Sequence, residues 1–214
     1  MTSILDLLAP PPPDGHRIHG VVTGVVTNNR DEKKLGRVKV RFDWLADTYE
    51  TDWARVAVPM AGKERGTWMI PAVGDEVLVA FDHGDIGHPY VVGSLWSQTD
   101  GPPKSGAAAG SEVTVLHSRS GHVVRLDDRK GEEKIEITDR SGKNSVVIST
   151  RDNAITLTCQ GDLTLESKGG KVVVKGAKGV DVTSQGPVQV EAGADMGLRA
   201  KGAVKVKGST IDLN

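Results

Sequence analysis

The chain has 214 residues, a formal net charge of −1 and a single cysteine, Cys159. The near balance of 27 basic and 28 acidic residues argues against a protein that binds nucleic acid mainly by neutralising phosphates. One cysteine excludes an intrachain disulfide. The start, MTSILDLLAPPPPDG, lacks the basic residues of a signal peptide, and its apolar run is too short to span a membrane. We therefore expect assembly in the cytoplasm.

Aromatic residues divide the chain into two regions. All eight lie between Phe42 and Trp96, and residues 97–214 contain none. The stretch SQTDGPPKSGAAAGSE, which follows Trp96, has the composition of a linker. The predicted parts are an N-terminal segment over 1–15, a barrel domain over 16–97, a linker over 98–112 and a repetitive region over 113–214.

Five short β-strands are predicted in the aromatic region. They lie in HGVVTGVVTNN, LGRVKVRF, DWARVAVPM, GDEVLVAFDHG and HPYVVGSLW. Apolar and polar residues alternate in these stretches, and Gly, Pro and Asp residues separate them as turns. Five short strands that close into a barrel have the size of an OB-fold, so we expect this fold over 16–97.

The tryptophans raise the question of nucleic-acid binding. OB-folds often bind single strands through aromatic residues in a basic groove. Acidic residues surround Trp44 and Trp53 in the sequence and would repel a phosphate backbone; they are Asp43, Asp47, Glu50 and Asp52. We interpret the tryptophans as core or interface residues. The alternative is a trimeric OB-fold binding module for nucleic acid or glycan, carried on a β-helical stalk.

The region after the linker repeats a short strand motif with a glycine corner. Apolar residues at i and i+2 place two side chains on one face of a strand. Early pairs are Val113/Val115, Ile135/Ile137 and Val146/Ile148. The core positions predicted after these are Ile155, Leu157, Leu163, Leu165, Val172, Val174, Val180, Val182, Val188, Val190, Val204 and Val206.

One chain of this repeat has no way to bury its apolar pairs. A lone ribbon of short strands would leave both edges open to pairing with other chains. Three chains wound into a triangular prism would bring the aliphatic pairs together on the axis, where aromatic rings have no room. The predicted fold is therefore all-β, with an OB-fold barrel followed by an intertwined trimeric β-helix. A disordered tail is the alternative, but valine at period two argues against it.

Both regions together resemble a known family. The stretches GRVKVRFDW, DWARVAVPMAG, PAVGDEVLVAFDHGD and HPYVVGSLW are similar to the OB-fold of the spike proteins of contractile injection machines. These include the type VI secretion valine-glycine repeat spike and the phage baseplate assembly protein V family. The most specific parts are Gly74–Val77 and Pro89–Gly93. The resemblance implies a homotrimeric, membrane-puncturing central spike in a phage tail, tail-like particle or type VI-like system.

The resemblance also implies partners. Only about fifteen residues precede the barrel, so we expect the baseplate hub to be a separate protein. Its predicted docking residues are Ile4, Leu5, Trp44 and Trp53. A conical tip protein of the proline-alanine-alanine-arginine type is expected on Ile211, Leu213 and Asn214. The linker is too short for an inserted lysozyme domain, and no effector domain is expected. The spike would belong to the baseplate of a virion or injection particle and be delivered outward on contraction.

Nothing in the sequence predicts an enzyme, a cofactor or a metal. None of the six histidines has the spacing of a structural zinc site. His83 and His88 flank a predicted turn, whereas His117 or His122 would bind a metal only if three copies met on the axis. The acidic pairs Asp127/Asp128 and Glu132/Glu133 are predicted to lie in solvated turns, and Cys159 to be an inert thiol. A secreted trimeric adhesin is disfavoured by the missing signal peptide.

Overall fold

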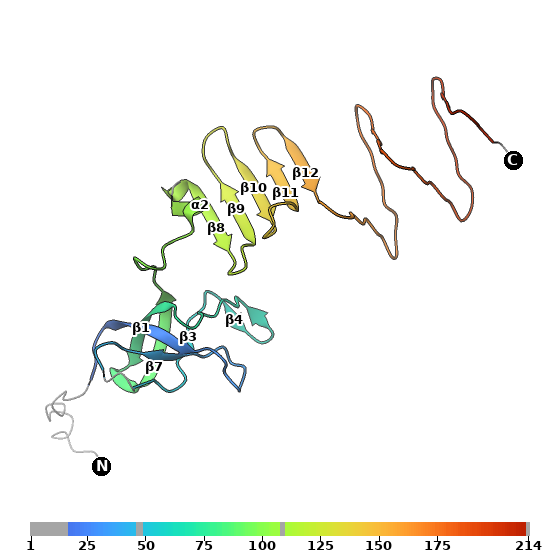
Figure 1. The fold of residues 1–214 in the computed structure, drawn as a ribbon. Helices are drawn as coiled ribbons and strands as arrows, with labels where there is room; N and C mark the ends of the chain where they lie inside the picture. Colours follow the sequence, from blue (N-terminus) through green and yellow to red (C-terminus); the bar gives the residue numbers. More distant parts are fainter. Residues whose placement is uncertain (1–16, 46–48, 108–109, 213–214) are drawn as a thin grey trace, which may run out of the picture. The chain divides into compact units, whose positions relative to one another are not determined.

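The computed structural model describes residues 17–45, 49–107 and 110–212 (Figure 1). Within these ranges the secondary structure is β apart from two short turns of helix, α2 (Lys104–Ala107) and η1 (Gly110–Glu112). The chain divides into two compact units, Met1–Gly161 and Asp162–Asn214. The first unit contains two five-stranded sheets.

The first sheet follows the predicted strands of the aromatic region. Its strands are β1 (Val21–Asn28), β2 (Lys39–Arg41), β3 (Arg55–Val56), β6 (Glu76–Asp82) and β7 (Asp85–Ser94). Their order in the sheet is β2-β1-β6-β7-β3, and all neighbours are antiparallel except β3 and β7. A small hairpin, β4 (Ala61–Gly62) with β5 (Arg65–Gly66), lies between β3 and β6 in the chain.

The two outer strands of this sheet are joined by further pairing. Val38 and Ala54 exchange two backbone hydrogen bonds, of 3.0 and 2.7 Å, and Arg41 forms an antiparallel bridge with Glu50. The segment before β3 therefore pairs with β2, while β3 itself pairs with β7. This pairing curls the sheet into the five-stranded barrel that the sequence predicts, so the OB-fold is confirmed.

The barrel core is aliphatic with two phenylalanines. It consists of Val26, Val38, Val40, Phe42, Ala54, Val77, Val79, Phe81 and Val91. Phe42 is fully buried, and its ring lies 5.6 Å from Trp44 and 5.7 Å from Phe81 between centroids. None of the four tryptophans is buried, so their interpretation as core residues is wrong. The alternating valines fill the narrow interior and leave the indoles outside.

The second sheet is a simple antiparallel meander. Its strands are β8 (Val113–His117), β9 (Val123–Asp127), β10 (Lys134–Thr138), β11 (Ser145–Ser149) and β12 (Ala154–Thr158). They lie side by side in chain order (Figure 1). The repeat pattern predicts pairing between chains, whereas the three inner strands pair on both edges within one chain.

Turn residues explain why this sheet forms within one chain. Each connection contains a residue with positive φ: Gly121 at 101°, Gly131 at 81°, Gly142 at 69° and Asn153 at 48°. Left-handed conformations of this kind reverse the chain tightly, and glycine and asparagine adopt them at the least cost. Each strand therefore folds back beside the one before it.

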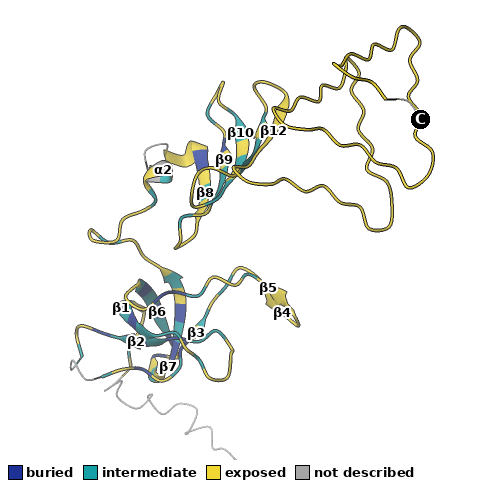
Figure 2. Ribbon diagram, turned by 45° about the vertical axis from the view of Figure 1, so that its right-hand side comes forward, coloured by how far each residue is buried: buried dark blue, intermediate teal, exposed yellow. Residues whose placement is uncertain are grey.

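The second unit has a different character. Residues 162–212 contain no assigned strand, and every one of them is exposed (Figure 2). Among its glycines only Gly179 has a positive φ, and its value of 157° is close to extended. The chain bends at 168–170, 177–178, 185–186, 193–194 and 201–202, and no strand pairing joins the apolar stretches between these bends.

Gly24 gives a test of the barrel packing. A Cβ atom at Gly24 would lie 2.5 Å from Val40 Cγ1 and 2.9 Å from Phe42. We expect Gly24→Ala to lower the free energy of unfolding by about 1–3 kcal/mol, because the core has no room for the methyl group. Gly93→Ala is the matched control, since nothing lies within 4 Å of that position. Tryptophan fluorescence during urea unfolding reports this domain selectively, because all four tryptophans lie between residues 44 and 96. Equal stability of the two variants would contradict the packing.

Candidate functional site

One face of the second sheet is a continuous aliphatic surface. The pairing register aligns two rows of side chains across all five strands. The first row is Thr114, Leu126, Ile135, Ile148 and Ile155, and the second is Leu116, Val124, Ile137, Val146 and Leu157. Residues two apart on a strand point to the same side of the sheet, so both rows lie on one face. We call these two rows the aliphatic face.

No part of the described chain covers the aliphatic face. Seven of its nine aliphatic side chains are between 40% and 72% exposed (Figure 2). Exposed apolar patches of this extent mark interaction surfaces in soluble proteins. The aliphatic face is therefore the candidate functional site of the chain, and its chemistry is that of an assembly interface.

The opposite face of the sheet is mostly polar. It carries Arg125, Asp127, Lys134 and Glu136, and it also carries Val113 and Val115. The i, i+2 pattern groups these two valines with the inward pairs, but the register puts Leu116 on the aliphatic face instead. Val113 is only 8% exposed, and α2 packs on β8 with Gly106 close to Val115. The short helix α2 thus packs against the strand that carries these two valines, on the polar face of the sheet.

Asp127 is the centre of an ion cluster on the polar face. Its side chain is fully buried and accepts hydrogen bonds from Arg125 Nη2 at 2.8 Å and from Arg129 Nε and Nη2 at 2.9 and 2.7 Å. Hydrogen bonds from Arg129 hold the pKa of Asp127 well below its usual range, against the opposing effect of burial. The prediction of a solvated turn is therefore wrong for Asp127, because two guanidinium groups enclose its carboxylate.

The predicted core positions from Ile155 onward are all exposed within the single chain. Ile155 and Leu157 lie on the aliphatic face, and the pairs from Leu163 to Val206 follow in the second unit. Met196 and Leu198 form a further exposed apolar pair that is absent from the predicted core positions. The signal was available: apolar pairs start at Val180, Val188 and Val204, and a step of eight from Val188 falls on Met196.

A comparison with known families bears on the barrel. Residues 22–96 match the model of the "Type VI secretion system/phage-baseplate injector OB domain". This match covers the five barrel strands from β1 to β7. The chain carries an injector OB domain.

Curated relatives are spike proteins. The chain is 29% identical to the "Type VI secretion system spike protein VgrG1a" of Pseudomonas aeruginosa over 146 residues, which are 61% of this chain and 23% of the relative. It is 38% identical to VgrG5 of the same organism over 132 residues, 56% of this chain and 17% of the relative. The "Actin cross-linking toxin VgrG1" of Vibrio cholerae is 30% identical over 121 residues, 53% of this chain and 10% of the relative. The chain thus spans less than a quarter of the length of these relatives.

The predicted hub-docking tryptophans lie on the surface of the injector OB domain. Trp44 is half exposed and stacks on Phe42. Trp53 lies between two cations, with Arg37 Cζ 5.7 Å and Lys39 Nζ 5.6 Å from its ring centroid. Both cations are paired with carboxylates, Arg37 with Asp31 and Lys39 with Glu50. The Trp53 amide also donates a hydrogen bond of 2.7 Å to Asp52 Oδ1, so acidic groups lie beside Trp53 as the sequence predicts. The remaining docking predictions on Ile4, Leu5, Leu213 and Asn214 lie outside the described residues, while Ile211 is half exposed.

His88, His117, His122 and Cys159 have ordinary surroundings. His117 lies on the polar face of the second sheet, and His122 Nδ1 accepts a hydrogen bond of 3.1 Å from the Arg140 amide. His88 Nδ1 lies 2.9 Å from Asp85 Oδ2 beside the β6–β7 turn, while Cys159 is exposed. Within residues 17–45, 49–107 and 110–212, no three His, Cys, Asp or Glu residues are grouped as metal ligands. In the same ranges, no helix has the length and apolar character needed to cross a bilayer.

The Asp127 cluster makes stability depend on pH in a defined direction. The pKa of Asp127 is lowered on folding, so its charged form adds stability above its ordinary pKa of 3.8, and this is lost as pH falls toward the lower folded value. We expect Asp127→Asn to unfold at lower urea concentration than the wild type near pH 7, with the difference shrinking below about pH 4. Asp128→Asn, at an exposed neighbour, is the control. Far-UV circular dichroism follows the sheet. A constant difference between Asp127→Asn and wild type down to about pH 2 would argue against the ion cluster.

Proposed function

We propose that the chain is the homotrimeric central spike of a contractile injection machine, with a β-helical shaft that transmits the thrust of contraction to a target membrane. The observation that carries this proposal is the aliphatic face, which nothing in the described part of the chain covers. Its apolar i, i+2 pattern recurs along the sequence of residues 162–212, where the pairs are also exposed. The spike relatives and the injector OB domain support the same role.

Three copies provide the cover that one copy lacks. Each sheet of β8–β12 would form one side of a triangular prism, with three aliphatic faces meeting on the axis. The polar face, with Arg125, Lys134 and Glu136, would then point to solvent. Apolar burial of this kind contributes roughly 25 cal/mol per Å² removed from water, and it is the driving force that we assign to assembly. In this proposal the domain order remains a barrel over 16–97, a linker over 98–112 and a spike over 113–214.

Strand pairing supports a change in assembly after β12. Up to Thr158 the strands find partners within the chain, whereas residues 162–212 have none there. Backbone donors and acceptors in a packed shaft must be paired. We infer that the short apolar stretches of this region take their strand partners from the other two copies.

A second pattern fits a narrow core. From the Ile155 pair onward, the residue four positions after the first member of each apolar pair, on the same strand phase, has a small side chain. These positions are Cys159, Ser167, Gly176, Ser184, Ala192, Ala200 and Gly208. Close approach of three chains at a prism corner would require small residues at such a place. The pattern begins with Ile155, at the last strand that pairs within the chain.

Partners follow from the same proposal. The barrel would seat the trimer on a separate hub protein, with Trp44, Trp53 and the segment around Ile4 and Leu5 as its contacts. The far end at Ile211–Asn214 would carry a conical tip protein of the proline-alanine-alanine-arginine type. The machine would assemble in the cytoplasm. The role is mechanical, so the residues that matter are those that set shape and stiffness.

The mass in solution tests the trimer. Light scattering of the full chain should give about three times 22.7 kDa. Val188→Asp should dissociate the trimer or lower its melting temperature strongly, because three carboxylates would meet near the axis and burial of a charge costs several kcal/mol. Gln189→Asp is the matched control, since the adjacent residue points to the opposite face. A monomer of 22.7 kDa, or equal effects of the two substitutions, would overturn the prism.

The role in injection is tested in the organism that encodes the chain. Deletion of the coding region should abolish contraction-dependent delivery, and complementation with Gln189→Asp should restore it while Val188→Asp should not. Electron microscopy of purified sheath and tube particles, with mass spectrometry, should find the chain in the baseplate. A chain that trimerises but is absent from such particles would contradict the spike role and leave the trimer intact.

A further inference from the structure

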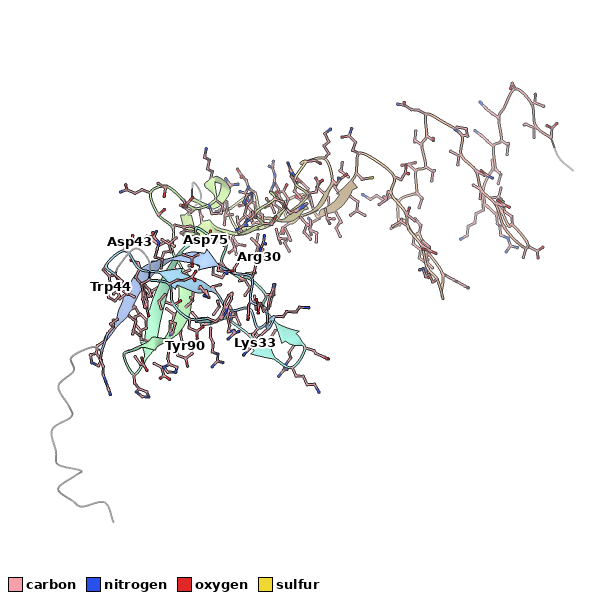
Figure 3. The ribbon with its side chains drawn as sticks, turned by 60° about the horizontal axis from the view of Figure 1, so that its bottom comes forward. Arg30, Lys33, Asp43, Trp44, Asp75 and Tyr90 are labelled. Atoms are coloured by element: carbon pink, nitrogen blue, oxygen red, sulfur yellow. The ribbon has the colours of Figure 1, made fainter. Side chains whose placement is uncertain are left out.

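The injector OB domain has two ends with different surfaces. Strands β1 and β6 are antiparallel, so the 29–38 loop after β1 and the 57–75 segment before β6 meet at one end. The β6–β7 turn lies at the other end, where Ile18 donates a hydrogen bond of 2.9 Å to the Gly84 carbonyl. Figure 3 shows Arg30 and Lys33 on the side of the β4–β5 hairpin, and Asp43 and Trp44 on the opposite side of the barrel.

The end with the β4–β5 hairpin carries cations without acidic partners. Arg30, Lys33, Lys34, Lys63 and Arg65 are all exposed, and none of them has an ion pair within the described part of the chain. Their neighbours differ: Arg37 pairs with Asp31 at 2.7 Å, and Lys39 pairs with Glu50 at 2.9 Å. Glu32 and Glu64 are exposed in the same loops, so the five cations leave a net charge of +3 available to an external partner.

Large apolar side chains stand among these cations. Trp68 is 72% exposed and Leu35 is 66% exposed, and Met60 and Met69 are each more than half exposed. The two loops are in contact, because a Cβ atom at Gly36 would lie 3.0 Å from both the Trp68 ring and Ile70. Asn29 Nδ2 also donates a hydrogen bond of 3.1 Å to the Pro71 carbonyl. Together these residues and the five cations form what we call the cationic loop surface.

The loop of this surface is held in one conformation. Asp31 accepts hydrogen bonds from the amides of Lys33 and Leu35, both at 3.0 Å, and from the Arg37 guanidinium at 2.7 and 2.9 Å. Lys34 and Gly36 have φ of 55° and 70°, which turns the loop tightly. A loop that is ordered before it binds loses less conformational entropy on binding. The 29–38 loop would therefore lose little conformational entropy when a partner binds.

We propose that the cationic loop surface binds an acidic surface of another protein. Tryptophan, methionine and arginine are enriched in the centres of protein interfaces, and unpaired cations at the rim select an acidic partner. A single-stranded nucleic acid is less suited, because it stacks its bases on several aromatic rings along a groove. Trp68 is instead the one aromatic residue among those that define this surface, and Met69 follows it in the chain. This inference does not depend on the trimer or on the role in injection.

The probe for this surface is a fluorescein-labelled random copolymer of glutamate and tyrosine, in a ratio of about four to one. We expect the full chain to raise its fluorescence anisotropy at about 50 mM NaCl, and added salt to weaken the binding. The double variant Lys33→Glu/Lys63→Glu should bind at least about tenfold more weakly. The matched double variant Lys130→Glu/Lys143→Glu changes the charge equally outside the barrel and should stay within about twofold of the wild type.

The apolar centre has its own control. Trp68→Ala should weaken binding about tenfold, whereas Val21→Ala, at an exposed apolar residue toward the opposite end of the barrel, should not. Circular dichroism and light scattering of each variant separate loss of binding from loss of fold or assembly. Absence of copolymer binding, or equal weakening by the two charge variants, would overturn the proposal. Tighter binding to an oligo(dT) strand than to the copolymer would also overturn it and point to nucleic acid.

Discussion

The aliphatic face of β8–β12 is the constraint on which the architecture depends. Two rows of isoleucine, leucine and valine side chains are aligned by the strand register and left without cover. A flat sheet with one apolar side must bury that side against another layer. The polar side is poorly suited as that layer, because it carries charged side chains such as Arg125, Lys134 and Glu136. Repetition of the chain is then the simplest source of a second and third layer.

Backbone conformation explains why one repetitive region has two forms. Before Gly161 the connections contain left-handed residues such as Gly142 and Asn153, and the strands fold back as hairpins. Among residues 162–212 only Gly179 has a positive φ, of 157°, and the apolar stretches between the bends form no strand pairs with one another. Composition differs as well: residues 113–161 contain four glycines and five arginines, whereas residues 162–214 contain nine glycines and one arginine. In the first region the left-handed turns direct strand pairing inside the chain.

The injector OB domain is stabilised by other means. Its valines and two phenylalanines fill a closed interior, so the domain has no need of a second copy to bury its core. Its tryptophans stay on the surface, and two sets of loops give its ends different charge and apolar character. In the proposed spike, such a self-sufficient barrel would be seated on a partner while the repetitive region assembles with two other copies.

Much of this organisation could be predicted from sequence alone, because period two decides which side chains share a strand face. That rule was sufficient for the five barrel strands, for the pairs from Ile135 to Leu157, and for the change of character after Trp96. It could not show that Leu116, rather than Val115, lies on the aliphatic face, since a shift of one residue in register exchanges the faces. The rule also could not show that Asp127 is buried or that the tryptophans lie outside the core. Burial depends on which side chains the fold brings together: Arg125 and Arg129 enclose Asp127, and valines fill the barrel core in place of the indoles.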